Sequence, residues 1–152
     1  MNIDLIEDIL DHPNPQRVLE KVRDTLRKEG VARKKFRAWL KPDVKAEFIN
    51  GEVVAHSPAR RRHNQTVRFI NYLIDTFITD RDLGEVAIEK AMVELERNDF
   101  EPDVCFWKKE TAADFTDDQL YYPAPDLVVE VLSKSTEGRD RGVKFRSYEE
   151  AG

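Results

Sequence analysis

This sequence of 152 residues has no long apolar run, no excess of positive charge and only one cysteine. No apolar run approaches the roughly 20 residues that span a bilayer, so we expect no membrane-spanning helix. The first residues, Met1–Asp4, include no basic region ahead of an apolar segment, so we expect no signal peptide. The net charge of −5 argues against a protein that coats nucleic acid by bulk electrostatics. The net charge does not exclude an enzyme with a locally basic entrance and an acidic metal site.

The single cysteine, Cys105, can form no internal disulfide and lies in a strand-like pattern. We expect a small buried hydrophobic side chain there rather than a reactive thiol. This cysteine usage favours an intracellular, cytoplasmic location. The length corresponds to about one domain, large enough for a substantial core.

Residues 1–43 predict a helical N-terminal extension. Apolar residues recur at helical spacing between Gln16 and Glu29, and Gly30 predicts a stop. The next segment, Val31–Leu40, mixes basic and aromatic residues. It could contact nucleic acid, but a solvated helical face with two core aromatics is the favoured interpretation.

Residues 44–152 predict a mixture of strands and helices. Asn50-Gly51 is typical of a tight hairpin turn, because both residues tolerate positive φ. Ser57-Pro58 predicts a helix start, with serine as the cap and proline at the first helical position. The predicted elements are strands over Ala46–Ile49, Glu52–His56, Glu85–Leu95, Val104–Trp107 and Leu127–Ser133, and helices from Ser57 to about Thr79 and from Asp140.

Two Pro-Asp dipeptides, Pro102-Asp103 and Pro125-Asp126, each open an apolar run that predicts a strand. Both faces of the second run look buried, and Glu130 stands within it. A charge there costs several kcal/mol unless it is paired. Asp126 and Glu130 share a strand face but lie about 13 Å apart, too far to bind one ion together. Asp103 on the other strand is the natural partner of Glu130, and we expect Asp126 to organise the strand entrance.

Two converging carboxylates favour a cation between them, and Mg²⁺ needs only one or two when a phosphate completes its shell. Such an ion can activate a water for attack on a phosphodiester. Lys144, on the following helix, is our candidate to orient that water or neutralise charge. Spacing alone favours a different role, an exposed ion pair with Asp140 four residues earlier. A structural ion pair between Glu130 and Arg141 is a further alternative.

Arg60, Arg61, Arg62 and His63 begin the helix expected after Ser57. Cations in a first turn oppose the helix macrodipole, and a bound phosphate would remove that conflict. Three side chains splayed into solvent are the alternative for the arginines. His63 by itself fits a core histidine as well as a ligand or a base.

Several blocks occur here in a distinctive order: Glu47–Val54, Ser57-Pro58, His63, Glu101–Val104, Pro125–Ser133, Asp140–Phe145 and Tyr148. This order resembles the Uma-two family of putative restriction endonucleases, within the PD-(D/E)XK nuclease superfamily. The resemblance covers about residue 44 to the C-terminus. It implies a restriction-endonuclease-like α/β fold, with a mixed central sheet flanked by helices.

The resemblance also implies Mg²⁺-dependent hydrolysis of DNA, with Mn²⁺ as a possible substitute. By motif position, Asp103 and Glu130 match the acids of the family. Lys144 matches a lysine relocated onto the next helix. Glu47 matches a hairpin acid that completes the site.

His63 and Asp126 match recurrent polar positions of the family. Similar sequences continue into at least one more strand, so the resemblance implies a core without its final strand. The exposed sheet edge makes a homodimer plausible. The expected function is a metal-dependent DNA endonuclease. The alternative, favoured by the negative charge and the helical extension, is a catalytically silent nuclease-fold module for binding or oligomerisation.

Overall fold

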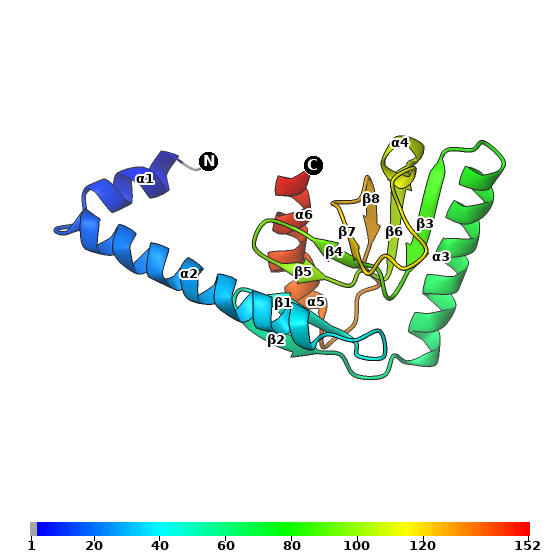
Figure 1. Ribbon diagram of the computed structural model, residues 1–152, viewed down its shortest axis with the longest axis horizontal. Helices are drawn as coiled ribbons and strands as arrows, with labels where there is room; N and C mark the ends of the chain where they lie inside the picture. Colours follow the sequence, from blue (N-terminus) through cyan, green and yellow to red (C-terminus); the bar gives the residue numbers. More distant parts are fainter. Residues whose placement is uncertain (1–2) are drawn as a thin grey trace.

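The computed structural model describes residues 3–152 and contains eight strands among its helices (Figure 1). The helical segments are α1 (Ile3–Leu10), α2 (Pro15–Trp39), α3 (Arg61–Thr79), α4 (Lys109–Ala112), α5 (Glu137–Arg139), the π-helical η1 (Asp140–Lys144) and α6 (Phe145–Ala151). The strands are β1 (Ala46–Ile49), β2 (Glu52–Ala55), β3 (Gly84–Ile88), β4 (Met92–Glu94), β5 (Asp99–Phe100), β6 (Val104–Lys108), β7 (Tyr121–Tyr122) and β8 (Leu127–Val129). No helix within residues 3–152 combines the length and apolarity needed to cross a membrane.

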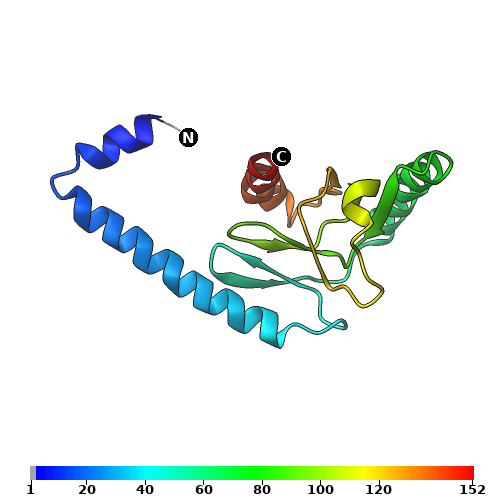
Figure 2. The ribbon, with the colours of Figure 1, turned by 45° about the horizontal axis from the view of Figure 1, so that its top comes forward.

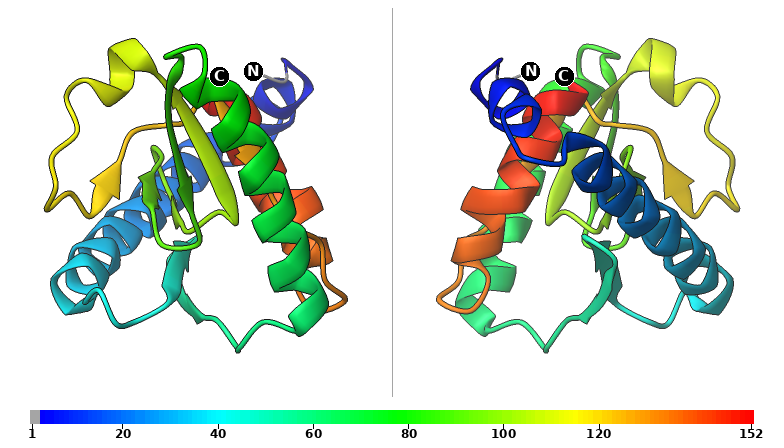
Figure 3. Two further views of the ribbon diagram at one scale, coloured as in Figure 1. Left: turned by 90° about the vertical axis from the view of Figure 1, so that its right-hand side faces the viewer. Right: turned by 90° about the vertical axis from the view of Figure 1, so that its left-hand side faces the viewer.

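The strands form two hydrogen-bonded sheets, with the orders β2-β1-β5-β4-β7 and β3-β6-β8. Neighbouring strands are antiparallel except for β4 and β7, which are parallel. Helices α2 and α3 lie on opposite sides of the strands (Figure 3). The predicted α/β fold, a mixed central sheet flanked by helices, is therefore confirmed.

The chain passes between the two sheets at Glu101–Asp103, between β5 and β6. Pro102 has no N–H to donate, so a continuous ladder cannot run through it. The strand predicted over Glu85–Leu95 is likewise two strands, because Glu89 adopts a φ of +61° between them. Glu89 N donates to Asp103 O (3.1 Å), so the two crossings lie side by side. The acidic side chains at this bend therefore do not follow the alternation between two faces that a regular strand imposes.

The hairpin predicted around Asn50-Gly51 is confirmed. Both residues have positive φ, 49° and 90°, as a two-residue turn of the primed type requires. The pairing of Ile49 with Glu52 closes the hairpin, and β2 ends at Ala55, one residue earlier than expected.

Helix α2 is continuous, so the predicted stop at Gly30 is wrong. Glycine inside a helix costs about 1 kcal/mol, and the contacts made by the residues that follow outweigh that cost. Phe36 is buried against Phe48, with ring centroids 5.7 Å apart. Trp39, the other expected core aromatic, is 52% exposed.

Three further element boundaries differ from the prediction. Helix α3 begins at Arg61 rather than Ser57, because Arg60 is extended (φ −74°, ψ 151°). Strand β8 ends at Val129 and is an edge strand, so Leu127 and Leu132 are 43% and 42% exposed rather than buried. The last helical region begins three residues before Asp140 and passes through the π-helical η1.

Cys105 is fully buried as expected, and burial raises the pKa of its thiol.

Two arginines of α2 share one buried carboxylate. Arg33 donates through Nε and Nη2 to the two oxygens of Asp99 (2.9 and 2.5 Å), and Arg37 donates in the same way (3.1 and 2.7 Å). Burial alone would raise the pKa of Asp99, but these two guanidinium groups hold it below the ordinary value of 3.8. The arrangement fastens the C-terminal half of α2 to β5.

The N-terminal half of α2, together with α1, extends away from the strands (Figure 2). Apolar side chains on this arm are exposed: Leu5 by 59%, Leu10 by 66%, Val22 by 48% and Leu26 by 47%. Within residues 3–152, nothing buries this apolar surface.

Replacing Asp99 by asparagine (Asp99→Asn) should lower the free energy of unfolding by about 3 kcal/mol, because two guanidinium groups lose their shared partner. Urea denaturation at pH 7 measures the change. Asp24→Asn is the matched control, since Asp24 pairs with Arg27 at the exposed surface. It should change stability by less than about 0.5 kcal/mol.

The pH dependence checks the charge contribution separately. Because the folded pKa of Asp99 is lowered, its stabilisation is present above the unfolded pKa and is lost as pH falls through the folded pKa. The gap between wild type and Asp99→Asn should therefore narrow as pH falls below 3.8 and close below the folded pKa of Asp99. An unchanged gap would contradict the ion-pair interpretation.

Candidate active site

Lys144 lies at the centre of the candidate site, buried in η1 with 3% exposure. Its Nζ donates to Glu130 Oε1 (2.8 Å) and lies 2.6 Å from Glu47 Oε1. Asp140 Oδ1 is 3.9 Å from the same nitrogen, beyond hydrogen-bond distance. The Lys144–Asp140 pair that spacing favoured is therefore present only as a long contact, and it is buried rather than exposed. Lys144 is held more closely by Glu47 and Glu130 and joins β1 to the end of β8.

Glu47 points inward from β1 and is 1% exposed. Its Oε1 also accepts from the backbone N of Glu101 (2.9 Å), and its Oε2 lies 3.0 Å from His56 Nε2. Burial alone would raise the pKa of Glu47, but His56 and Lys144 lower it below its ordinary value. Glu47 is therefore an ionised, tightly held carboxylate.

Glu130 follows β8 directly, and its Oε1 accepts from Tyr148 OH (3.1 Å) as well as from Lys144. Burial raises the pKa of Glu130 to about 7, and the nearby carboxylates of Glu47 and Asp103 add to the increase. Burial alone would lower the pKa of Lys144, but Glu47 and Glu130 raise it above its ordinary value. The site thus contains one positively charged lysine among several carboxylic acids.

Asp103 lies at the bend between the sheets, next to Glu130. The pairing of Val104 with Val129, continued by one residue, sets Asp103 opposite Glu130. Asp103 Oδ2 accepts from Val131 N (2.7 Å), so a carboxylate replaces the next strand hydrogen bond. Asp103 Oδ1 lies 3.2 Å from His63 Nε2 on α3. The structure therefore brings Glu47 and Glu130 together at Lys144 and places Asp103 next to Glu130.

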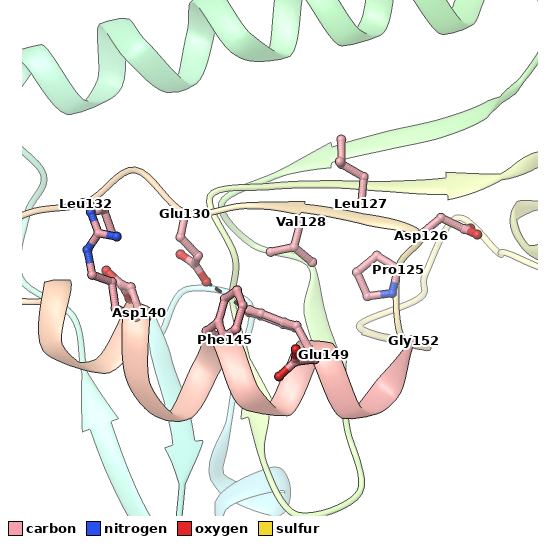
Figure 4. A pocket seen from close by; sticks show the side chains of 12 residues that line it. Pro125, Asp126, Leu127, Val128, Glu130, Leu132, Asp140, Phe145, Glu149 and Gly152 are labelled. Carbon is pink, nitrogen blue, oxygen red and sulfur yellow. Dashed lines mark hydrogen bonds between the residues drawn. The ribbon is translucent and has the colours of Figure 1, made fainter.

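Asp126 does not join this group. Its Oδ1 lies 2.6 Å from Lys108 Nζ, and its Oδ2 accepts from Lys108 N (2.9 Å). Figure 4 shows Asp126 at the far end of the strand from Glu130. Asp126 organises the strand entrance, as its spacing predicted. Arg141 donates to Glu137 (3.0 Å), so the alternative pairing of Glu130 with Arg141 is wrong.

The four basic residues around the start of α3, one of them the capping residue Arg60, point in two directions. His63 faces inward to Asp103, whereas Arg60, Arg61 and Arg62 are exposed. No ion pair among residues 3–152 involves these three arginines. They remain candidates for a phosphate contact on the outer side of the site.

Three side chains near the acids were not assigned a role from the sequence: His56, Glu101 and Tyr148. Glu101 is 5% exposed, its Oε2 has no hydrogen-bond partner, and burial raises its pKa to about 7. The Glu-Pro-Asp order carried a signal, because residues two apart in an extended segment share a face. Nothing local in the sequence connects His56 or Tyr148 to Glu47 and Glu130.

A groove of about 410 Å³ opens beside Glu130, between β8 and α6 (Figure 4). Leu132, Asp140, Phe145 and Tyr148 are among the residues that line it. Phe145 is 58% exposed at its rim. The groove offers a route by which a ligand can approach Glu130 from solvent.

Within residues 3–152, no three His, Cys, Asp or Glu side chains are already arranged as a metal site. Lys144 instead occupies the position between the carboxylates. The donor chemistry nevertheless fits a hard divalent cation, because every acid available is an oxygen donor. Glu47 and Glu130 hold a single lysine, and Asp103 lies opposite Glu130. The backbone N–H of Glu101, a residue whose Oε2 is orphaned, donates to Glu47.

The sequence profile of the Uma2 family, described as "Putative restriction endonuclease", matches residues 33–152. The chain belongs to the Uma2 family. The match begins inside α2, earlier than residue 44, and includes Arg33 and Arg37, which fasten that helix to the sheet.

Two relatives are similar to this Uma2 protein. "Uncharacterized protein sll1609" of Synechocystis sp. is 33% identical over 107 residues, which are 68% of this chain and 59% of the relative. The crystal structure of a "putative nuclease belonging to DUF820" from Anabaena variabilis has a TM-score of 0.61 at 14% identity. That similarity covers 73% of this chain and 65% of the other, and at this identity it supports the fold alone. The chain thus spans less than two thirds of either relative.

Replacing Lys144 by methionine (Lys144→Met) should lower the free energy of unfolding by about 3 kcal/mol, because Glu47 and Glu130 lose their common partner. Lys134→Met, at an exposed lysine, is the control and should change stability by less than about 0.5 kcal/mol. Chemical denaturation in metal-free buffer measures both. A loss below about 1 kcal/mol for Lys144→Met would contradict a central role for this cation.

Proposed function

We propose that this Uma2 protein is a metal-dependent endonuclease that hydrolyses DNA phosphodiester bonds, with Mg²⁺ as cofactor and Mn²⁺ as a substitute. The convergence of Glu47 and Glu130 on Lys144, with Asp103 beside them, is the observation that carries this proposal. Membership of a family described as restriction endonucleases supports the same reaction class.

In this proposal Asp103 and Glu130 hold the ion, and Glu47 is a third ligand. A bound divalent ion supplies Lewis acidity and a water of lowered pKa. Lys144 Nζ orients the attacking water and offsets the negative charge that develops on the phosphorus oxygens. The water oxygen bonds to phosphorus as the bond from phosphorus to the leaving oxygen breaks. His63 positions the Asp103 carboxylate from α3.

Arg60, Arg61 and Arg62 contact the phosphate backbone in this proposal. Their guanidinium groups are exposed beside the turn that carries His63, the residue that contacts Asp103. Guanidinium groups bind phosphate oxygens in a bidentate way, which holds the scissile bond in register. Asp126 is a supporting residue that fixes the start of β8 through Lys108.

Replacing Glu130 by alanine (Glu130→Ala) should reduce plasmid nicking by roughly 100-fold or more, because even residues behind metal ligands affect activity by about 10- to 100-fold. The assay incubates supercoiled plasmid with Mg²⁺ or Mn²⁺ and follows open-circular product on a gel. Glu150→Ala, at an exposed glutamate of α6, is the control and should nick as wild type does. Equal nicking by wild type and Glu130→Ala would remove Glu130 from catalysis.

Calorimetric metal titration separates this function from a silent module. An active site should bind a divalent ion, and Asp103→Asn should abolish that binding. Binding without nicking by wild type would leave a metal-binding scaffold. A wild type that neither binds a divalent ion nor nicks DNA would overturn the enzyme proposal.

A second candidate function is a nuclease-fold module for binding or oligomerisation, with a homodimer as its form. The arm formed by α1 and the first half of α2 favours it. Val22 and Leu26 lie on the same helix face as Phe36, yet nothing within residues 3–152 buries them. The eight residues of α1 are too few for a stable isolated helix in water, so a second arm would stabilise this one.

Replacing Val22 and Leu26 by serine should convert a dimer to a monomer, because each exposed apolar side chain would be covered by the second copy. Light scattering coupled to size exclusion measures the mass. Val31→Ser is the control, since Val31 is 53% exposed but lies on the opposite face of α2. A wild type that is monomeric at all concentrations would contradict the homodimer.

A further inference from the structure

The outer face of α3 carries a polar groove separate from the acids. Arg61, Asn64, Gln65 and Arg68 line this shallow groove of about 610 Å³. The four residues recur at helical spacing, so they share one face of the helix. Every side chain that lines the groove can donate hydrogen bonds, and none is acidic.

This face of α3 is positively charged, although the whole chain carries a net negative charge. The sequence has a net charge of −5, yet the segment from Arg60 to Ile74 contains four arginines and no acid. Other arginines, such as Arg33 and Arg97, are paired with carboxylates. Among the described ion pairs, none involves Arg61 or Arg68. The groove therefore has unmatched positive charge for an anionic partner.

The start of α3 also breaks local rules of helix stability. It has no capping side chain and no acid in its first turn, while Arg61 and Arg62 oppose the macrodipole. Such conflicts between local preference and structure concentrate at functional sites. A polyanion bound along this face would remove the conflict.

The groove lies next to the candidate active site. His63, in the same turn as Arg61 and Asn64, contacts Asp103 (3.2 Å). Arg61 and Arg68 are about 10.5 Å apart along the helix axis. Figure 1 shows α3 along the outside of the protein, where a long partner can lie against it.

We propose that the Arg61–Arg68 face of α3 docks in the major groove of double-stranded DNA and determines which sequences are bound. This inference rests on the proposed function for its substrate. Arg61 and Arg68 contact phosphates on either side, and Asn64 and Gln65 reach base edges between them. Asparagine and glutamine pair in a bidentate way with adenine, and a helix fits the width of the B-form major groove. The narrow major groove of RNA duplexes excludes the same docking.

The phosphate contacts are tested by anisotropy of a labelled DNA duplex, without divalent ions so that no hydrolysis occurs. The double variant Arg61→Gln/Arg68→Gln should bind at least about 10-fold more weakly. Its plot of log K against log salt should be shallower by about 2. The control is Arg17→Gln/Arg23→Gln, at two exposed arginines of α2, and should match wild type. An unchanged salt slope, or equally tight binding of duplex RNA, would overturn the docking.

The base contacts are tested by selecting bound duplexes from a random library and sequencing them. Asn64→Ala/Gln65→Ala should keep the salt slope of wild type but lose about 5- to 100-fold of its preference at adenine-containing positions. A wild type without sequence preference would overturn the reading role of Asn64 and Gln65. These binding results are independent of nicking, so the failure of this inference and the failure of the nuclease proposal are distinguishable.

Discussion

The buried ammonium group of Lys144 is the interaction on which the acidic centre depends. Glu47 lies in one sheet and Glu130 directly follows the edge strand of the other, and each would be an uncompensated buried charge without this lysine. The lysine is delivered by the π-helical η1, a rare geometry often found at functional sites. The same cation that stabilises the fold therefore also fixes the spacing of the carboxylates.

The bend between the sheets supplies the remaining acids. Pro102 interrupts the ladder, and Asp103 then takes the place of a strand partner by accepting from Val131 N. On the other side of the bend, Arg33 and Arg37 fasten Asp99 to α2. The acids around Glu101–Asp103 are thus held from both sides. Such support by fixed neighbours keeps a metal or substrate site in one geometry.

Much of the fold followed from local sequence. Asn50-Gly51 specified the hairpin through its tolerance of positive φ, and the family resemblance specified the α/β class. Predictions failed where tertiary contacts outweigh local preference. Gly30 did not end α2 because Phe36 and its neighbours pack beyond it. The run after Asp126 did not form one long buried strand, because β8 is an edge strand and Asp103 ends its pairing.

The sequence by itself determined which carboxylates need a partner, since Glu130 lies in an apolar run and Asp103 follows a proline at a strand start. Only the tertiary structure decided which residue each carboxylate pairs with. Spacing favoured Asp140 for Lys144, whereas the folded chain places Glu47 and Glu130 closer to its nitrogen. The reason is physical: contacts between residues 47, 130 and 144 depend on how two sheets and a helix pack, which no local pattern encodes.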